Sequence, residues 1–196
     1  QDKFSHGIYV GALKRFTLTG SHIKGTDHGH QIKSRALLNH IQYNRIEDVA
    51  GGNSSRLVDL PNCGLTYIIG NDLQQAETTG NIDAIGYGAE GCDGRSARER
   101  HLFVVNNTLV NEAFNGTLVK NHSDGEAFVA NNLLFGGGYF LLGNGVQENN
   151  STINLSFRQP GHWAALQGAG PRDTALALPD EEGVSLLPTR VFSPPL

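Results

Sequence analysis

The chain has 196 residues and a formal net charge of −4, and its 15 Lys and Arg residues are scattered. This length suits one domain with a substantial core, and the absence of a basic patch argues against a nucleic-acid partner. No apolar run approaches the roughly 20 residues that cross a bilayer, so no membrane span is expected. Gly and Asn are abundant and Met is absent, which favours many tight turns over long helices.

The first expected strands, in chain order, align with one another. Residues 6–10 match residues 30–34 and then residues 56–60, each with an apolar residue at the centre. Side chains alternate across a strand, so the residue after each central one should face outward. The inward and outward pairs are Ile8 and Tyr9, Ile32 and Lys33, and Val58 and Asp59. Arg35 should lie two positions beyond Lys33 on the same side.

A second pattern recurs five times between these strands and beyond them. An apolar residue is followed three positions later by Asn, or once by Ser, and two positions after that by another apolar residue. The central positions are Ser21, Asn44, Asn71, Asn107 and Asn132. They lie 23, 27, 36 and 25 residues apart, and the polar segment 91–100 accounts for the longest interval.

Stacked coils of chain explain this spacing. If each coil supplies strands joined by a tight turn, equivalent residues lie about 4.8 Å apart, and an Asn in each turn can hydrogen bond to the Asn above and below. Connections between parallel strands prefer the right hand. The sequence therefore predicts an all-β fold, a right-handed single-stranded parallel β-helix (solenoid). A sandwich of short antiparallel strands is the alternative.

The expected coils cover residues 1–158, and residues 159–196 form a Pro/Ala-rich tail that packs on the helix or caps it. Residue 1 lies just before the first strand, so the N-terminal end is expected to lack a cap. Either coils are missing upstream or that end meets a partner, such as a second copy of the chain. Cys63 and Cys92 could form a disulfide or remain as two thiols, and secretion or a periplasmic location is expected.

A dense polar group is expected on one flank of neighbouring coils. It includes cations, carboxylates, imidazoles and phenols, a convergence that a functional site requires. His30 is a candidate general base, because its ordinary pKa lies near neutrality. The expected substrate-binding residues are His6, Tyr9, Asp59, Tyr87 and Glu90. The alternative interpretation is a solvated face with ordinary ion pairs, such as Lys33 with Asp59.

The Asn column and the coil spacing over residues 6–157 resemble the pectate-lyase-like superfamily of right-handed β-helices. Residues 32–34, followed by Asn39, are similar to the segment around the catalytic Lys of the chondroitinase B and alginate lyase family. That family's catalytic Arg lies about one coil later, where this chain has Arg56. The resemblance implies β-elimination on an acidic polysaccharide, with Lys33 as the base and with Arg56, helped by Arg35, holding the uronate carboxylate.

No cofactor is required by the sequence. The family carries acidic calcium ligands shortly before its Lys, where this chain offers Asp27 with His28 and His30. A divalent cation, calcium by resemblance, would be held by Asp27 and His28. Alternatively, the His-x-His spacing would let His28 and His30 bind a transition metal together with Asp27.

Two functions are expected from these patterns. The first is a carbohydrate-active protein, a polysaccharide lyase or an epimerase, whose partner is an acidic polysaccharide. The second is a β-helix without catalysis that serves as an adhesin, a fibre-forming subunit or a polysaccharide-binding module. An enzyme needs Lys33 and Arg56 to converge on a cleft, whereas an assembly protein needs ends that stack on another copy.

Overall fold

The computed structural model describes residues 5–153 and 174–190, which contain eighteen strands and one 3-10 turn, η1 (Arg98–Arg100). The strands form three parallel sheets of six strands each. Sheet A contains β1 (Ile8–Val10), β4 (Ile32–Ser34), β7 (Val58–Leu60), β10 (Asp83–Tyr87), β13 (Thr117–Asn121) and β16 (Tyr139–Leu142). Sheet B contains β2 (Phe16–Thr19), β5 (Leu38–Gln42), β8 (Leu65–Ile69), β11 (Leu102–Val105), β14 (Ala127–Ala130) and β17 (Gly145–Glu148). Sheet C contains β3 (His22–Lys24), β6 (Arg45–Glu47), β9 (Asp72–Gln75), β12 (Thr108–Asn111), β15 (Leu133–Phe135) and β18 (Ser151–Ile153).

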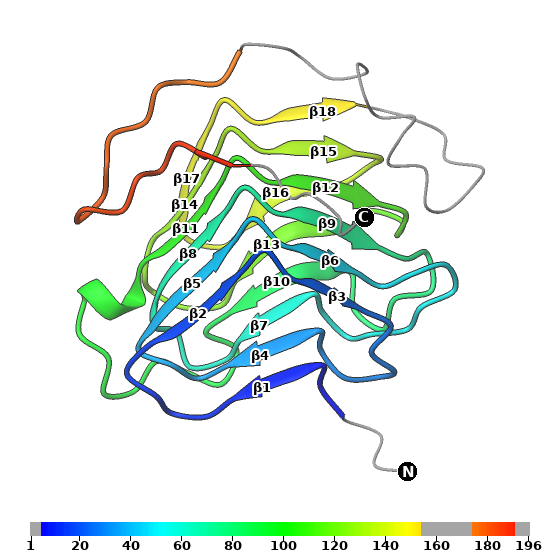
Figure 1. The fold of residues 1–196 in the computed structure, drawn as a ribbon, viewed down its shortest axis with the longest axis horizontal. Coiled ribbons are helices and arrows are strands. Elements are labelled where there is room, and N and C mark those ends of the chain that lie inside the picture. Colours follow the sequence, from blue (N-terminus) through cyan, green and yellow to red (C-terminus); the bar gives the residue numbers. More distant parts are fainter. Residues whose placement is uncertain (1–4, 154–173, 191–196) are drawn as a thin grey trace.

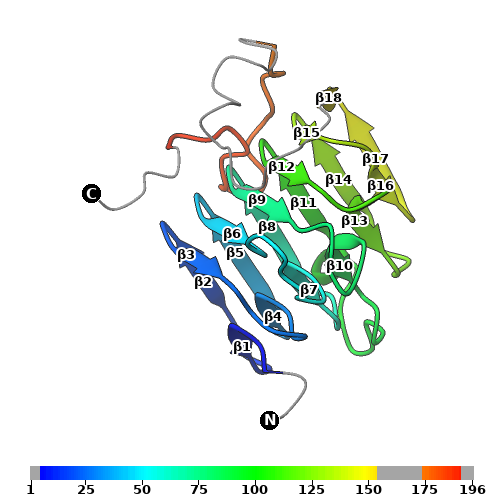
Figure 2. The same ribbon diagram turned by 90° about the vertical axis from the view of Figure 1, so that its right-hand side faces the viewer.

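Three consecutive strands, one from each sheet, make one coil, and six coils stack from β1–β3 to β16–β18 (Figure 1). The coils turn clockwise as they recede from the viewer in Figure 1, and Figure 2 shows the same stack from the side, so the helix is right-handed. All ladders between the named strands are parallel, which confirms the predicted β-helix and excludes the antiparallel sandwich. None of the helical segments in the described residues is long and apolar enough to span a membrane.

The interior is filled by columns of apolar side chains. In sheet A the register joins the expected inward residues to their equivalents in later coils. This column consists of Ile8, Ile32, Val58, Ile85, Val119 and Leu141. Its four middle members are completely buried, and burying one such side chain stabilises the fold by about 1.5–3 kcal/mol.

The predicted Asn ladder runs along the turn between sheets B and C. Asn71 is typical: its backbone N–H and its Nδ2 both donate to Oδ1 of Asn107 at 2.9 Å, and Nδ2 also donates to the Ile41 carbonyl of the preceding coil. The ladder has a further member, Asn150, which accepts from Asn132 at 2.9 and 3.0 Å. Each amide therefore satisfies backbone groups that a buried turn would leave unpaired.

The residue before each ladder position has left-handed backbone geometry, with φ between 47° and 64° in every coil. These residues are Gly20, Tyr43, Gly70, Asn106, Asn131 and Asn149. Gly and Asn adopt this conformation at little cost, which is why five of the six positions carry them.

The outward Asn side chains at this turn hold the described part of the C-terminal segment, residues 174–190. Asn149 donates to the Thr174 carbonyl at 2.8 Å, Asn131 to Leu176 at 2.9 Å and Asn106 to Leu186 at 2.8 Å. The segment covers the outer face of sheet B, where Leu178 and Leu186 pack into a second apolar cluster with the aromatic residues of β8 and β11. Residues 159–173 and 191–196 of the expected tail lie outside the described residues.

Candidate functional site

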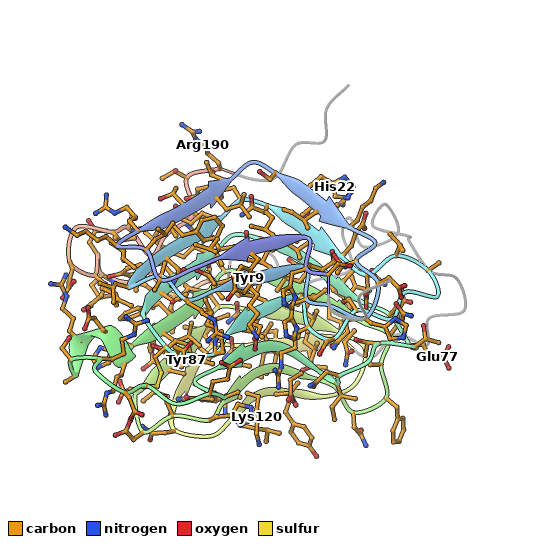
Figure 3. The ribbon with its side chains drawn as sticks, turned by 90° about the horizontal axis from the view of Figure 1, so that it is seen from below. Tyr9, His22, Glu77, Tyr87, Lys120 and Arg190 are labelled. Carbon is orange, nitrogen blue, oxygen red and sulfur yellow. A yellow bond between two sulfur atoms is a disulfide. The ribbon has the colours of Figure 1, made fainter. Side chains whose placement is uncertain are left out.

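The outer face of sheet A carries the aligned polar residues. The ladder pairs Tyr9 with Lys33 and Lys33 with Asp59, as the sequence predicts. The same column continues through Gly86 to Lys120 in the fifth coil. Figure 3 looks onto this face, with Tyr9 and Lys120 labelled on either side of its centre. The first three coils thus place Tyr9, Lys33 and Asp59 about one strand spacing apart, and Lys120 follows two spacings beyond Asp59.

Asp59 is the centre of the charged network. Its side chain is only 3% exposed, and its Oδ2 lies 3.3 Å from Lys33 Nζ and 3.3 Å from His30 Nε2. Its Oδ1 accepts from Arg56 at 3.1 Å. A carboxylate this deeply enclosed needs such partners, because an unpaired buried charge is strongly destabilising. Asp59 therefore holds three of the predicted site residues in one arrangement.

Arg56 lies across the outward position of the next coil. A Cβ atom added to Gly86 would come within 2.6 Å of Arg56 Nε, so the glycine leaves the room that the guanidinium occupies. Arg56 also lies 3.8 Å from Asp83. A glycine inside an otherwise apolar strand is the sequence signal for such a close approach.

An aromatic stack extends from this network to the first coil. The rings of His6 and His30 are parallel with centroids 5.0 Å apart, and His6 also stacks on Tyr9 at 5.6 Å. His6 Nδ1 accepts from the His30 backbone N–H at 3.0 Å. Burial lowers the pKa of His30 to about 4 despite Asp59, so its imidazole is neutral at neutral pH. The Tyr9 ring remains 56% exposed.

Lys33 and Arg35 form a carboxylate fork, the name we give to this pair. Glu90 occupies it: Lys33 Nζ lies 3.1 Å from Glu90 Oε1 and Arg35 lies 2.7 Å from Oε2. Hydrogen bonds from Arg35 and then Lys33 lower the pKa of Glu90 to about 2. Arg35 Nε also donates to the Tyr9 hydroxyl at 3.1 Å, and its Nη1 donates to Asn62. The fork therefore joins the aromatic stack to the charged network.

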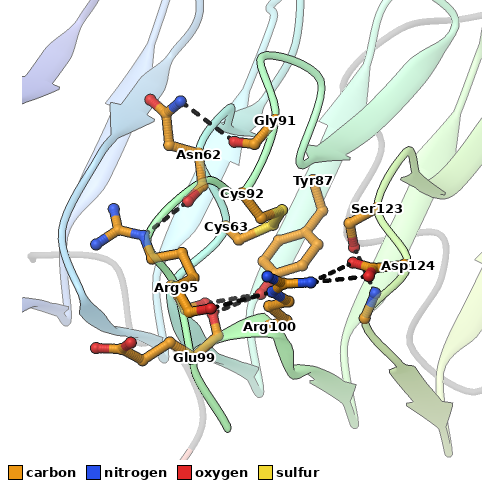
Figure 4. The surroundings of a disulfide bond; sticks show 12 residues. Asn62, Cys63, Tyr87, Gly91, Cys92, Arg95, Glu99, Arg100, Ser123 and Asp124 are labelled. Carbon is orange, nitrogen blue, oxygen red and sulfur yellow. Dashed lines mark hydrogen bonds and ion pairs between the residues drawn. A yellow bond between two sulfur atoms is a disulfide. The ribbon is translucent and has the colours of Figure 1, made fainter. Parts of the chain in front are cut away.

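Glu90 comes from the segment between β10 and β11, which is fastened to the turn after β7. Cys63 and Cys92, left open by the sequence, form a disulfide with Cα atoms 5.4 Å apart (Figure 4). Glu90 N–H donates to the Pro61 carbonyl at 2.8 Å. Arg95, from the same segment, donates to the carbonyls of Asn62 at 2.9 Å and Arg35 at 3.0 Å. These contacts hold Glu90 over the fork.

A polar cavity of about 270 Å³ lies beside this segment. Its walls include Cys92, Arg100 and His122, and the Arg100 guanidinium contacts both oxygens of Asp124 at 2.8 and 3.0 Å. Burial, Arg56 and Lys120 lower the pKa of His122. The sequence does not predict a role for Arg100 or His122, because only the fold brings the two loops together.

Tyr87 does not lie in the cluster. Ile85 points inward, so Tyr87 two positions later also points inward, and its side chain is fully buried. Its hydroxyl lies 3.0 Å from the Gly64 carbonyl, and burial raises its pKa well above the ordinary value. Strand alternation in the sequence was sufficient to place this residue. Tyr43 also lies outside the cluster, at the turn between sheets B and C, where its hydroxyl accepts a hydrogen bond from Thr189 N–H at 3.3 Å.

Asp27 and His28 lie on the connection between β3 and β4 and are largely exposed. His28 Nδ1 lies 2.6 Å from Asp27 Oδ1, and Asn53 of the next coil is their further neighbour. Over residues 5–153 and 174–190, no group of three or more His, Cys, Asp and Glu side chains is arranged to hold a metal ion. The residues present do not fit a complete metal site of the expected kind.

No protein-family model matches the chain, and neither does any curated protein or solved structure with which it was compared. The fold class therefore comes from the three parallel sheets and the buried Asn stack themselves.

Proposed function

We propose that this β-helix binds an acidic polysaccharide on the outer face of sheet A. The observation that carries the proposal is the exposed Tyr9 ring, which stacks on His6 and accepts a hydrogen bond from Arg35 of the carboxylate fork. The apolar face of a sugar ring packs against an aromatic ring, and a guanidinium recognises a carboxylate with paired hydrogen bonds. One uronate residue can meet both requirements at this point.

The resemblance around Lys33 to the chondroitinase B and alginate lyase family favours the same substrate class. The Cys63–Cys92 disulfide supports a secreted or periplasmic location, because disulfides persist in oxidising compartments. Lys120 extends the charged column two coils beyond Asp59, which favours a ligand that runs along several coils.

β-Elimination is the second candidate, and the neutral imidazole of His30 favours it. In this reaction a base takes the proton beside the uronate carboxylate, the electron pair forms a carbon–carbon double bond, and the bond to the leaving glycosidic oxygen breaks. The neutral imidazole of His30 can accept a proton, whereas the ammonium group of Lys33 carries one and contacts two carboxylates at 3.1 and 3.3 Å. The Tyr9 hydroxyl accepts from Arg35, so its own proton is available for the leaving oxygen.

The test of binding is titration calorimetry with alginate, pectate, chondroitin and dermatan, beside an uncharged glucan. We expect at least one acidic polymer to bind, and Tyr9→Ala to weaken binding about tenfold, the effect of losing one stacked ring. Tyr139→Ala is the matched control, since Tyr139 is equally exposed, at 56%, but lies in the last described coil. Equal binding by wild type and Tyr9→Ala would contradict the proposed platform.

The test of elimination is the ultraviolet absorbance of the unsaturated uronate product, measured with the same polymers. Loss of the signal in His30→Ala, with binding retained, would support His30 as the base. Loss of the signal in Lys33→Ala but not in His30→Ala would assign the role of base to Lys33. Absence of product with a polymer that binds would leave a polysaccharide-binding module without elimination chemistry.

A further inference from the structure

The three carboxylates of the cluster differ in their access to solvent. The side chains of Asp59 and Asp83 are 3% and 15% exposed, whereas that of Glu90 is 46% exposed. Asp59 contacts Lys33, Arg56 and His30 at once, so its removal would leave several groups unpaired. Within residues 5–153 and 174–190, the ion pairs of the Glu90 carboxylate are with Lys33 and Arg35 of the carboxylate fork, and its side chain is the most exposed of the three. It is the carboxylate of this cluster that can leave without unpairing a buried charge.

The fork keeps partners when Glu90 leaves it. Lys33 retains Asp59 at 3.3 Å, and Arg35 retains the Tyr9 hydroxyl and Asn62. A free carboxylate could then take the same two positions, with one oxygen on the ammonium and the other on the guanidinium. The geometry of Glu90 in the fork is thus the geometry expected of a bound uronate.

We propose that Glu90 is an internal competitor that occupies the binding position of the ligand's carboxylate, and that a ligand binds by displacing it. The proposal rests on the proposed function, because it concerns the same face of sheet A. Binding by displacement lowers the apparent affinity by the fraction of molecules in which the fork is open. Glu90 thereby sets the intrinsic affinity that an acidic ligand needs in order to displace it and bind.

The disulfide controls this competition. Cys92 lies two residues from Glu90, and the bond to Cys63 tethers the segment beside the fork, which keeps the effective concentration of the Glu90 carboxylate high. The pKa of Glu90, about 2, means that protonation does not release it near neutral pH. Reduction of the disulfide weakens the hold of Glu90 on the fork instead.

The chemistry of release is thiol–disulfide exchange. Cys92 is partly buried and lines the polar cavity, which is the side from which a small dithiol would approach the disulfide. The dithiol gives up two electrons and two protons and becomes a cyclic disulfide, while Cys63 and Cys92 become two thiols. The segment is then held over the fork only by hydrogen bonds such as those of Arg95, so the effective concentration of the Glu90 carboxylate falls and the apparent affinity for a carboxylate ligand rises.

The experiment uses glucuronate, a single uronate, as the probe. Its dissociation constant is measured from the Arg35 Nε–H nuclear magnetic resonance signal during titration. We expect Glu90→Gln to bind glucuronate about tenfold more tightly than wild type, corresponding to a fork that is open in about a tenth of the molecules. The matched control is Asp93→Asn, which removes one charge from the same segment away from the fork and should bind as wild type does.

Dithiothreitol provides a second measurement that does not depend on the variant. Reduced wild type should bind glucuronate more tightly than oxidised wild type, while Glu90→Gln should respond little to reduction. If Glu90→Gln binds no more tightly than wild type, or if glucuronate moves the Arg35 signal in neither protein, the proposal is overturned.

The outcome is separable from that of the proposed function. Tighter glucuronate binding by Glu90→Gln, together with no binding of any polymer by any variant, would retain the competitor and reject the polysaccharide role. Polymer binding that needs Tyr9 but is unaffected by Glu90→Gln would retain the polysaccharide role and reject the competitor.

Discussion

The outer faces of sheets A and B both carry stacked aromatic side chains, but they differ in how far those side chains are exposed. On sheet B, Tyr67 stacks on His40 at 5.2 Å and on Phe103 at 5.1 Å, and the described C-terminal segment covers this column. On sheet A, His6 stacks on His30 of the next coil at 5.0 Å and on Tyr9 of its own coil at 5.6 Å, but Tyr9 stays 56% exposed. The parallel register thus brings equivalent residues of neighbouring coils together on both faces. The described C-terminal segment covers the apolar column of sheet B.

The largest expected contrast is between the two tyrosines. Tyr67→Ala should lower the free energy of unfolding by about 3–5 kcal/mol, because it opens a cavity between β8 and the segment above it. Tyr9→Ala should change it by about 0.5 kcal/mol or less, since the ring is exposed. Urea unfolding of both variants at pH 7.5 measures the contrast. Equal losses would mean that the Tyr9 stack is structural and that sheet A is not an open binding face.

Asp59→Asn comes next in size and shows that part of sheet A is also structural. Losing the charge leaves Lys33 and Arg56 beside a neutral amide, which should cost about 3 kcal/mol of stability. Asp124→Asn is the control: its side chain is 73% exposed and its pair with Arg100 should be worth about 1 kcal/mol or less. Calorimetric melting of the two variants gives the comparison, and similar melting temperatures would show that the Asp59 network contributes no more than a surface pair.

A smaller effect concerns pH. The pKa of His30 is about 4 in the folded protein and 6.5 ordinarily, so the unfolded chain binds the proton more tightly. Stability linked to His30 is therefore complete above pH 6.5 and is lost as pH falls towards 4, by on the order of 2 kcal/mol. Urea unfolding at pH 7.5 and pH 4.5 should show a smaller difference in His30→Gln than in wild type. An unchanged difference would assign the pH dependence to other groups, such as His6 or His40, whose pKa values burial also lowers.

The smallest effect is expected in the C-terminal segment, residues 174–190, which covers sheet B. Arg98 forms an ion pair with Glu182, but its side chain is 64% exposed. Arg98→Ala should change the free energy of unfolding by about 0.5 kcal/mol or less, because apolar packing and the Asn contacts hold the segment. Hydrogen exchange at Leu186 would show whether the segment stays in place. A rise in its exchange rate to that of an open loop would mean that the Arg98–Glu182 ion pair holds the C-terminal segment on sheet B.

Much of the candidate site followed from alternation in the aligned strands. Tyr9, Lys33 and Asp59 were predicted on one face, and the ladder pairs them there. The extension of the Asn ladder to Asn150 was missed, because it lies only 18 residues after Asn132, where the last described coil has short turns. The sequence also does not predict that Gly86 leaves room for Arg56. A glycine in a strand indicates a close approach by another group, but it does not identify that group.

The sequence by itself determined the coil, because Asn in a tight turn and apolar residues on either side are local requirements that recur in every coil. It also determined that Tyr9, Lys33 and Asp59 share a face. Only the tertiary structure decided what each charge contacts, that Cys63 joins Cys92, and that the C-terminal segment covers sheet B. Those contacts join loops far apart in the chain, and loop paths depend on the packing of all six described coils together. Glu90 reaches Lys33, 57 residues away in the chain, because the disulfide and the stacking of the coils place it there.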